Sequence, residues 1–322
     1  MSLFRNVVWF AKGLKEYTRG GYESASKHFK PEDMKADISQ RSFMITGANS
    51  GIGKSAALAI AKQGGIVHLV CRNKQRGEAA LDEIKQASGN ENIHLHELDM
   101  SKPRDIYSFA QAFEKSGQPL HVLINNAGVL VAEKERQMTS DELELTFATN
   151  TLGTHILTTA LVPVLSKYDD PRVIIVTSGG MLVQKLDLKD IQFEGMRTFD
   201  GTMAYAQTKR QQVVMTEQYA KRWPNIHFSC MHPGWADTPG VQSSIPDFYA
   251  KMKDRLRTSE QGADTMVWLA VAPSVKNEPS GLFYQDRKAV SAHLPLAWTK
   301  SSAQEHEKLI QILDDMSQRF RV

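Results

Sequence analysis

Cysteine is scarce in this chain of 322 residues: only Cys71 and Cys230 occur, each inside an apolar run typical of a buried strand. Buried free cysteine behaves as a small hydrophobic side chain, so we interpret both residues as inert core thiols. Two cysteines do not make the disulfide framework of a small secreted protein. The sequence also has no Cys-x-x-Cys pair or His/Cys cluster with metal-ligand spacing, and we predict no metal site.

Long apolar runs and strong charge are missing as well. No stretch reaches the roughly 18 apolar residues of a membrane-spanning helix. The N-terminus lacks the unbroken apolar core of a secretory signal. We therefore expect an intracellular protein, cytoplasmic or peripherally associated with a membrane. The net charge of +3 is too small for a nucleic-acid-binding surface, so no nucleic-acid partner is expected.

The first residues nevertheless carry a pattern. Apolar residues recur at helical spacing over 3–15, interrupted by Arg5, Lys12 and Lys15, which predicts an amphipathic basic helix. This helix either docks on the folded domain, which we favour, or lies in a membrane interface with Trp9 and Phe10 inserted. A transit peptide is the least favoured alternative. The polar segment 18–40 that follows is interpreted as a loop or linker.

From Arg41 onward, short β-rich runs alternate with longer helical patterns. This alternation predicts an α/β fold, a single doubly wound parallel sheet of about seven strands with helices on both faces. The predicted organisation is an extension over 1–40, one domain over 41–290 and a helical tail over 291–322. The predicted strands are 42–46, 66–71, 93–98, 121–125, 172–177, 226–231 and 282–284, and the clearest helical patterns are 52–63, 141–165, 203–222 and 260–271.

A glycine-rich turn, TGANSGIG over 46–53, joins the first predicted strand to the first helix. Its spacing, Gly-x-x-x-Gly-x-Gly, departs from both the Gly-x-Gly-x-x-Gly fingerprint and the P-loop. Glycine at this place lets the backbone turn tightly and lets a phosphate approach the free N–H groups of a helix N-terminus. With a strand before it and a helix after it, the turn predicts a dinucleotide site of the Rossmann type. The candidate contacts are Gly47, Ser50, Gly51, Ile52 and Gly53.

The end of the second strand discriminates between the two nicotinamide dinucleotides. Arg72 stands where a carboxylate would bind the ribose 2′-hydroxyl of NAD, and a guanidinium suits a 2′-phosphate. NADP(H) is therefore favoured over NAD(H), unless Arg72 only caps the strand end in solvent. Asp99 either accepts the adenine amino group or caps the next helix. Asn125, in NNAG over 125–128, suits a backbone that packs against a flat ligand.

Tyr205 and Lys209 are the candidate proton-transfer pair. Their spacing of four places them on one face of a helix, and an ammonium near a phenol is expected to lower the phenol's pKa. The pattern is common on ordinary helices and gains weight only because it follows the glycine turn. Ser178, at the end of the fifth strand, is predicted to donate to the substrate oxygen, with Thr177 as the competing candidate.

Three further segments complete the predicted site. Asn150 lies in an otherwise apolar helical pattern, which favours a buried polar role over a solvent-facing one. After the sixth strand, PGWADT over 233–238 breaks sharply and brings Thr238 to the cofactor, whereas His232 is interpreted as structural. The predicted substrate lid, 239–258, mixes apolar side chains with basic ones that either face solvent or bind.

Taken together, these motifs resemble the short-chain dehydrogenase/reductase family over about 41–285. The resemblance implies a catalytic set of Ser178, Tyr205 and Lys209, with Asn150 supporting a water relay to Lys209. It also implies cofactor contacts from Gly47, Gly51, Gly53, Asp99, Asn125, Tyr205, Lys209 and Thr238. The spacing of 27 between Ser178 and Tyr205 (205 − 178) looks like the insertion of the retinol-dehydrogenase-like branch, as does the Cys-Arg end of the second strand.

The expected function is hydride transfer between NADP(H) and a lipophilic alcohol or carbonyl compound, as in a carbonyl reductase or alcohol dehydrogenase. The alternative is a cofactor-binding scaffold or redox sensor with little turnover, which the extension and the tail after Tyr284 motivate. An extended-type nucleotide-sugar epimerase is disfavoured, because TGANSGIG does not match its glycine spacing. The sequence implies a small-molecule partner and indicates no oligomeric state.

Overall fold

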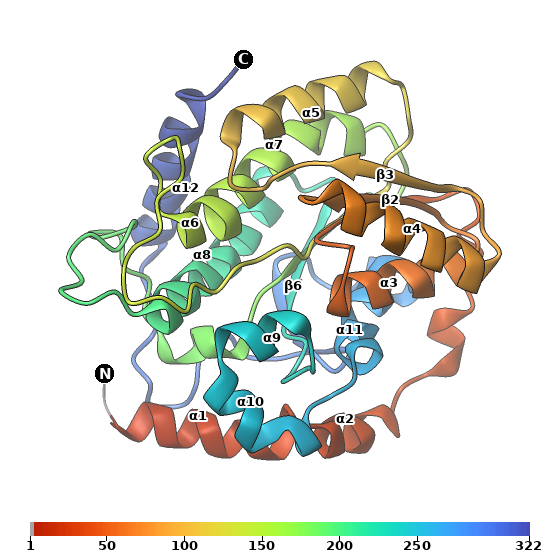
Figure 1. The fold of residues 1–322 in the computed structure, drawn as a ribbon. Coiled ribbons are helices and arrows are strands. Elements are labelled where there is room, and N and C mark those ends of the chain that lie inside the picture. The colour runs from red at the N-terminus through yellow and green to blue at the C-terminus, as the bar shows by residue number, and fades with distance from the viewer. Residues whose placement is uncertain (1–2) are drawn as a thin grey trace.

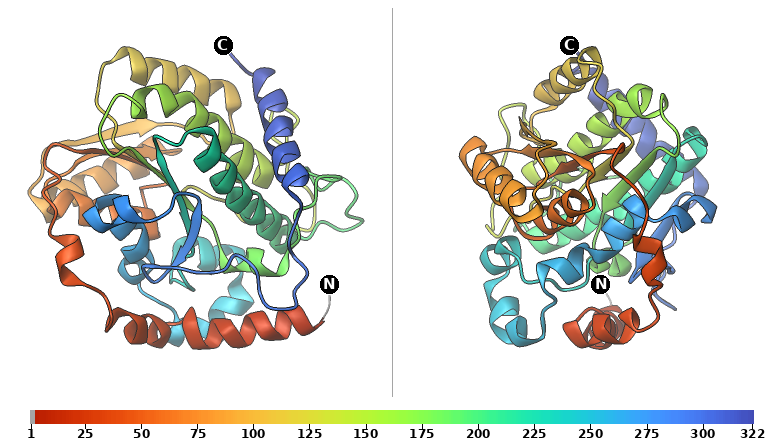
Figure 2. Two further views of the ribbon diagram at one scale, coloured as in Figure 1. Left: turned by 180° about the vertical axis from the view of Figure 1, so that it is seen from behind. Right: turned by 90° about the vertical axis from the view of Figure 1, so that its right-hand side faces the viewer.

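An eight-stranded sheet forms the centre of the computed structural model, which describes residues 3–322 (Figures 1 and 2). The strand order is β3-β2-β1-β4-β5-β6-β7-β8, and all neighbours are parallel except β7 and β8. The predicted α/β class is confirmed. The predicted number of strands is one too low, because two-residue β8 is too short to leave a sequence pattern. The strands are β1 Ser42–Thr46, β2 Ile66–Cys71, β3 Ile93–Glu97, β4 Val122–Asn125, β5 Arg172–Val176, β6 His227–Met231, β7 Leu282–Gln285 and β8 Lys288–Ala289.

Helices cover both faces of this sheet, because its central strands are apolar on both sides. One face is covered by α3 Gly51–Lys62, α4 Lys74–Ser88 and α11 Ser259–Val271. The other is covered by α5 Pro103–Lys115, α7 Thr154–Leu165 and α8 Gly201–Arg222, with α12 Ala303–Gln318 packed outside α8. Shorter helices are α6 Leu145–Phe147, α9 Pro239–Ser244 and α10 Pro246–Met252, and 3₁₀ helices span Pro31–Met34, Gly179–Val183, Lys253–Arg255 and Pro273–Asn277.

The helical pattern over 141–165 is interrupted in the structure. A π-helical turn, Ala148–Gly153, separates α6 from α7, and residues 141–144 lie outside the helix. Glu144 caps α6 by accepting the backbone N–H groups of Thr146 (2.9 Å) and Phe147 (2.7 Å). The predicted start at 141 is therefore too early, because capping rather than apolar periodicity decides where the helix begins.

The amphipathic N-terminal helix, α1 Leu3–Glu16, docks on the folded domain (Figure 1). The indole of Trp9 donates to the carbonyl of Gly179 (2.7 Å) and packs edge-on against Trp235. Gly13 lies so close to Trp235 that a Cβ at this position would sit 2.3 Å from the ring. Helix α1 therefore adopts the docked alternative, with the Trp9 ring packed against Trp235, and contact of this helix with a membrane stays a prediction.

The segment expected to be a linker is ordered as well, which corrects the interpretation of 18–40. It contains α2 Arg19–Ser26, capped by the Thr18 hydroxyl. Buried Arg257 holds its start by donating to the carbonyls of Glu16 (2.6 Å) and Tyr17 (3.1 Å), and it pairs with Asp286 at 2.7 Å. These partners are distant in sequence, so no local pattern announces them.

Two classes of feature are absent from residues 3–322. None of their helices combines the length and apolarity needed to cross a membrane. The same residues hold no group of three or more His, Cys, Asp or Glu side chains placed to bind a metal ion.

Candidate active site

The candidate residues gather at the carboxyl edge of the sheet, where the strand order reverses between β1 and β4. The connections that leave β1 and β4 run to opposite faces of the sheet, which opens a crevice at this edge, the usual ligand position in doubly wound folds. The glycine turn follows β1, Ser178 follows β5, and Thr238 follows β6.

Ser178, Tyr205 and Lys209 come together despite the long segment between the first two. Ser178 caps the 3₁₀ helix Gly179–Val183 by accepting the N–H of Gly180 (3.2 Å), and its hydroxyl is hydrogen-bonded to the Tyr205 phenol. The Lys209 ammonium lies 5.3 Å from the centre of the Tyr205 ring. Thr177, the competing candidate, is committed elsewhere, because its hydroxyl donates to the carbonyl of Lys209 (2.8 Å).

The electrostatics of this cluster differ from the expected lowering of the tyrosine pKa. Burial raises the pKa of Tyr205 to about 12, and the hydrogen bond from Ser178 opposes that rise only in part. Burial also lowers the pKa of Lys209 to about 7, so its charge is only partial at neutral pH. The sequence expectation considered the charge of Lys209 but not the desolvation of both groups, which the tertiary structure decides.

Lys209 is held in place by two acceptors. Its Nζ donates to the carbonyl of Val176 (2.8 Å) and to the side-chain oxygen of Gln212 (3.0 Å). Gly128 also approaches it, since a Cβ there would lie 3.3 Å from Nζ and 3.4 Å from Oδ1 of Asn150.

Asn150 lies in the π-helical turn and is fully buried, so the solvent-facing alternative is wrong. Its side chain clamps Val129, accepting that residue's N–H (2.8 Å) and donating to its carbonyl (2.9 Å). Its own carbonyl accepts the side-chain amide of Gln212 (2.7 Å). Gln212 thus connects Asn150 to Lys209 directly, at the place where the family resemblance implies a water relay.

The glycine turn has the shape of a phosphate cradle. Gly47 and Gly51 have φ values of +66° and +52°, and a Cβ at Gly47 would lie 3.0 Å from the backbone of Ala127. At Gly53, a Cβ would lie 2.4 Å from the amide of Asn126. Ser50 precedes α3 without capping it through its side chain, so the first N–H groups of this helix remain available to an anion.

The other predicted cofactor residues lie around this cradle. The methyl group of Thr238 contacts Gly51, because a Cβ added at Gly51 would lie 3.1 Å from it. The Thr238 hydroxyl caps α9. Ile52 packs against Gly262. Asn125 donates to the Thr158 hydroxyl (3.0 Å), while its buried Oδ1 has no partner among residues 3–322.

Asp99 and Arg72 differ in how they are held. Asp99 accepts the N–H (2.9 Å) and hydroxyl (2.8 Å) of Ser101 through one carboxylate oxygen, which shapes the turn after β3. Helix α5 starts later, after Lys102, so Asp99 does not cap that helix. Arg72 is exposed directly after β2.

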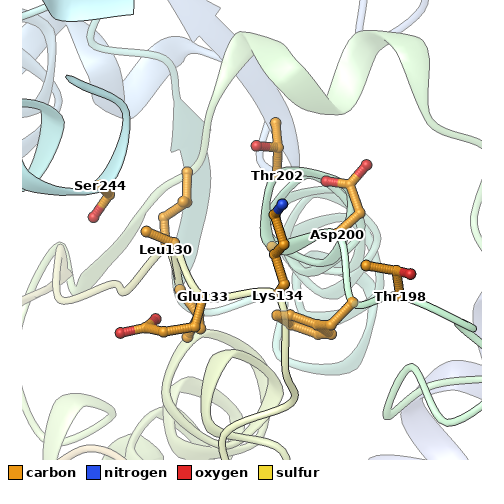
Figure 3. Close-up of a pocket in the computed structure, with 11 residues that line it drawn as sticks. Leu130, Glu133, Lys134, Thr198, Asp200, Thr202 and Ser244 are labelled. Atoms are coloured by element: carbon orange, nitrogen blue, oxygen red, sulfur yellow. The ribbon is translucent and has the colours of Figure 1, made fainter. Parts of the chain in front are cut away.

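Two cavities lie beside the catalytic cluster, on either side of the start of α8. The larger, about 700 Å³, is bounded by α1, the 3₁₀ helix after Ser178 and the first turn and a half of α8. The smaller, about 450 Å³, is shown in Figure 3: Thr202, Asp200 and Lys134 gather at the N-terminal end of α8, and Leu130 and Ser244 stand opposite. Asp200 and Thr202 line both cavities.

The predicted lid folds into α9 and α10. Phe248 packs edge-on against Trp235, with ring centres 5.1 Å apart. Lys251, Lys253 and Arg255 are exposed. Arg257, grouped with them in the sequence interpretation, is buried instead and belongs to the anchor of the N-terminal extension.

Sequence reasoning missed several residues that shape the site. Gln212 lies three positions after Lys209, and that helical spacing was the available signal. Gly179 is held on both sides, because its N–H donates to His232 (2.9 Å) and its carbonyl accepts from Trp9. His232 is thus structural, as interpreted, and burial keeps its pKa well below the ordinary value.

The fold and the order of these motifs define an oxidoreductase of the dinucleotide-binding α/β class, and the chain belongs to the short-chain dehydrogenase/reductase family. A model of that family, described as short chain dehydrogenase, matches residues 41–189. The chain is 59% identical to human dehydrogenase/reductase SDR family member 12 over 322 residues, covering 100% of both chains. The predicted resemblance to the family and to its retinol-dehydrogenase-like branch is confirmed.

More distant relatives agree with this assignment. The chain is 32% identical to mouse retinol dehydrogenase 12 over 250 residues, 76% of this chain and 77% of that one. Among solved structures, a short chain dehydrogenase from Shigella flexneri complexed with NADP matches with a TM-score of 0.63 and 22% identity. The match covers 79% of this chain and 100% of that chain, and it shows a shared fold.

Proposed function

We propose that this protein is an NADP(H)-dependent oxidoreductase that transfers a hydride between the nicotinamide and a lipophilic alcohol or carbonyl substrate. One observation carries the proposal: the Ser178 hydroxyl is hydrogen-bonded to the Tyr205 phenol, and the Lys209 ammonium lies beside the same ring. Two hydroxyl groups are thereby presented together at the carboxyl edge of the sheet, where a carbonyl oxygen can accept from both.

The residues present suit a nicotinamide dinucleotide. Gly47, Gly51 and Gly53 form a cradle that a Cβ would fill, and the uncapped start of α3 suits the pyrophosphate. The orphaned Oδ1 of Asn125 is a buried acceptor that a ligand can satisfy. Further contacts are assigned to Ser50, Ile52, Arg72, Asp99, Tyr205, Lys209 and Thr238. The Shigella protein of the same fold was crystallised with NADP, and Arg72 supplies the guanidinium that a 2′-phosphate needs.

In the reducing direction, NADPH supplies the hydride that the carbonyl carbon receives. Tyr205 gives its proton to the carbonyl oxygen, while Ser178 donates a hydrogen bond to that oxygen and stabilises the developing charge. Lys209 lies beside the phenolate that Tyr205 becomes, and its charge favours that form. Gln212 and Asn150 keep Nζ in this position. The oxidising direction reverses these steps.

A lipophilic substrate is favoured by the walls of the cavities beside the catalytic groups. The larger cavity is lined mainly by apolar side chains from α1 and α8. Pockets of about this size, roughly 300–1,000 Å³, commonly take small molecules. The relatives named retinol dehydrogenase support the same substrate class.

Peripheral membrane contact through α1 also belongs to the proposal. Trp9 packs against the protein, but Phe4 remains 50% exposed on a helix that also carries basic Arg5 and Lys15. Such a surface suits an anionic bilayer. Sedimentation with phosphatidylcholine vesicles, with and without phosphatidylserine, tests it. Binding that Phe4→Ser abolishes supports the contact, and no binding at any composition rejects it.

The proposed reaction is tested by NADPH oxidation with a panel of aldehydes and ketones. We expect turnover in the wild type, and a loss of at least about 100-fold in Tyr205→Phe, the usual size of an acid–base contribution. Tyr168→Phe is the control, because Tyr168 stacks on His121 before β4, at the opposite edge of the sheet. Equal rates in wild type and Tyr205→Phe would remove Tyr205 from the chemistry. Cofactor binding without turnover on any substrate would favour a scaffold or sensor.

A further inference from the structure

We propose that helix α1 is a wall of the substrate site, and that Val7 and Phe10 select for a long, uncharged hydrocarbon chain on the substrate. This inference rests on the proposed function and deepens it. Helix α1 precedes the segment that the family model matches, which begins at residue 41. Its contribution is therefore additional to the sheet-edge motifs that carry the family resemblance.

Helix α1 forms one side of the larger cavity. Helix α1 supplies nearly half of its lining, facing the 3₁₀ helix after Ser178 and the start of α8. The lining residues from α1 are Asn6, Val7, Trp9, Phe10, Ala11 and Leu14. The side chains of Val7, Phe10 and Leu14 are exposed, although α1 as a whole is docked, because they border this open cavity. An apolar ligand there would cover them.

The cavity comes close to the catalytic hydroxyl. Gly180 lines it, and a Cβ at Gly180 would lie 3.6 Å from Oγ of Ser178 and 3.9 Å from Cβ of Ala206. Ala206 lines the cavity as well and is the neighbour of Tyr205 in α8. A chain lying along α1 therefore reaches the point where a carbonyl group would meet Ser178 and Tyr205.

Contacts with the residues that follow Ser178 fix the position of α1. Trp9 donates to the carbonyl of Gly179, the residue after Ser178, and the N–H of Gly179 donates to His232. Tyr17, just past the end of α1, packs edge-on against His232, with ring centres 4.3 Å apart. Because these contacts join α1 to Gly179, helix α1 lies at a defined distance from Ser178. It can therefore discriminate between substrates by the length of their hydrocarbon chain.

The charge of the lining defines the chemistry of the ligand. Among the described residues that line the cavity, only Asp200 is ionisable, and its carboxylate caps α8 by accepting the N–H of Met203 (3.0 Å). Val183 and Met203 face α1 across the cavity. The described part of the lining offers no cation to pair with a carboxylate or phosphate on the substrate, so a saturated or polyene chain is the matching ligand.

The test compares straight-chain aldehydes from butanal to dodecanal as substrates with NADPH. In the wild type we expect kcat/KM to rise with chain length. Val7→Ser should lower kcat/KM for decanal about fivefold while leaving butanal unchanged, because a half-exposed valine contributes contact area but little to folding. Val7→Trp should fill the cavity and reverse the preference toward short chains. Phe4→Ser is the matched control, exposed on the same helix but outside the lining.

A binding measurement separates this inference from the proposed reaction. Titration of decan-1-ol, followed by intrinsic tryptophan fluorescence, reports on the cavity without turnover. If Val7→Ser bound decan-1-ol more weakly and no aldehyde were turned over, α1 would still line a ligand site, but the proposed reaction would be rejected. Turnover with the same chain-length profile in wild type, Val7→Ser and Val7→Trp would reject the wall alone. Equal effects of Phe4→Ser and Val7→Ser, or no decan-1-ol binding and no turnover, would also overturn it.

Discussion

The ammonium of Lys209 donates to the side-chain oxygen of Gln212 over 3.0 Å, and the amide of the same glutamine donates to the carbonyl of Asn150 over 2.7 Å. Gln212 is fully buried in α8. It links the π-helical turn that carries Asn150 to the lysine beside Tyr205. π-helical turns inside α-helices are frequent at functional sites, and here the turn presents a carbonyl to that link.

Replacing Gln212 is expected to impair proton transfer. Gln212→Leu leaves the Asn150 carbonyl and the Lys209 ammonium short of a partner, and we expect kcat to fall by about 10-fold or more. Gln212→Glu places a carboxylate beside Lys209, which raises the lysine's pKa above about 7 and extends activity to higher pH. The pH profile of kcat/KM measures both effects.

Gln211 provides the control for that experiment. It is equally buried in α8, but it accepts from the Thr151 hydroxyl (2.6 Å) rather than from Lys209. Gln211→Leu is expected to lower thermal stability without shifting the pH profile. An identical shift in both variants would mean that Gln212 acts through packing alone.

Arg72 is expected to decide the cofactor preference. Arg72→Asp removes the guanidinium and repels a 2′-phosphate, so the ratio of NADPH to NADH affinity should fall about 100-fold, the size of a bidentate charge-assisted contact. Cofactor fluorescence titrations with each dinucleotide measure the ratio. Lys74→Asp is the control, because Lys74 is also exposed near the end of β2 but is 4.0 Å from Glu78. Unchanged selectivity in Arg72→Asp would exclude it from the site.

The docking of α1 is expected to depend on Gly13. Trp235 is enclosed by the rings of Trp9, Tyr17 and Phe248, so it has no room to yield to a new Cβ. Gly13→Ala should therefore destabilise the fold by about 1–3 kcal/mol, as overpacked sites do. Chemical denaturation measures the change.

The same substitution at Gly20 is the matched control. A Cβ at Gly20, in α2, would meet nothing within 4 Å, so Gly20→Ala should be neutral or stabilise by up to about 1 kcal/mol. If Gly13→Ala were as stable as Gly20→Ala, the close packing of α1 on Trp235 would not hold in solution.

Acid is expected to destabilise the fold through His68. This side chain is 1% exposed, and its Nδ1 lies 2.9 Å from Nε2 of His96. Burial lowers the pKa of His68 to about 3 and that of His96 to about 4. The unfolded chain binds protons at these two histidines near pH 6.5, and the folded chain does not. The free energy of unfolding therefore falls as the pH drops from 6.5 toward 4. His68 alone contributes a loss on the order of 2 kcal/mol over that window.

His68→Leu should flatten this dependence, measured by denaturation midpoints between pH 7 and pH 4.5. Exposed His28 provides the control, and His28→Gln should retain the wild-type slope. A slope unchanged in His68→Leu would show that other groups control acid sensitivity.

Much of the fold was predictable because its signals are local. Apolar runs such as 66–71 and the glycine turn after Thr46 mark strand ends and helix starts within a few residues, and the alternation of these elements implies a parallel sheet. Strand β8 was not predicted because two residues leave no pattern, and helix α2 was not predicted because Arg257, distant in sequence, holds its start. The start of α6 at Leu145 was not predicted, because it is decided by capping from the buried side chain of Glu144.

The candidate site divides in the same way. The sequence by itself determined the family, the order of the motifs and the residue types at Ser178, Tyr205 and Lys209, because motif spacing is a property of the chain. Only the tertiary structure decided that desolvation raises the pKa of Tyr205, that Gln212 joins Lys209 to Asn150, and that Trp9 meets Gly179. Burial and hydrogen bonding between segments such as those of Trp9 and Gly179, 170 residues apart, depend on how the elements pack, and no local pattern encodes that packing.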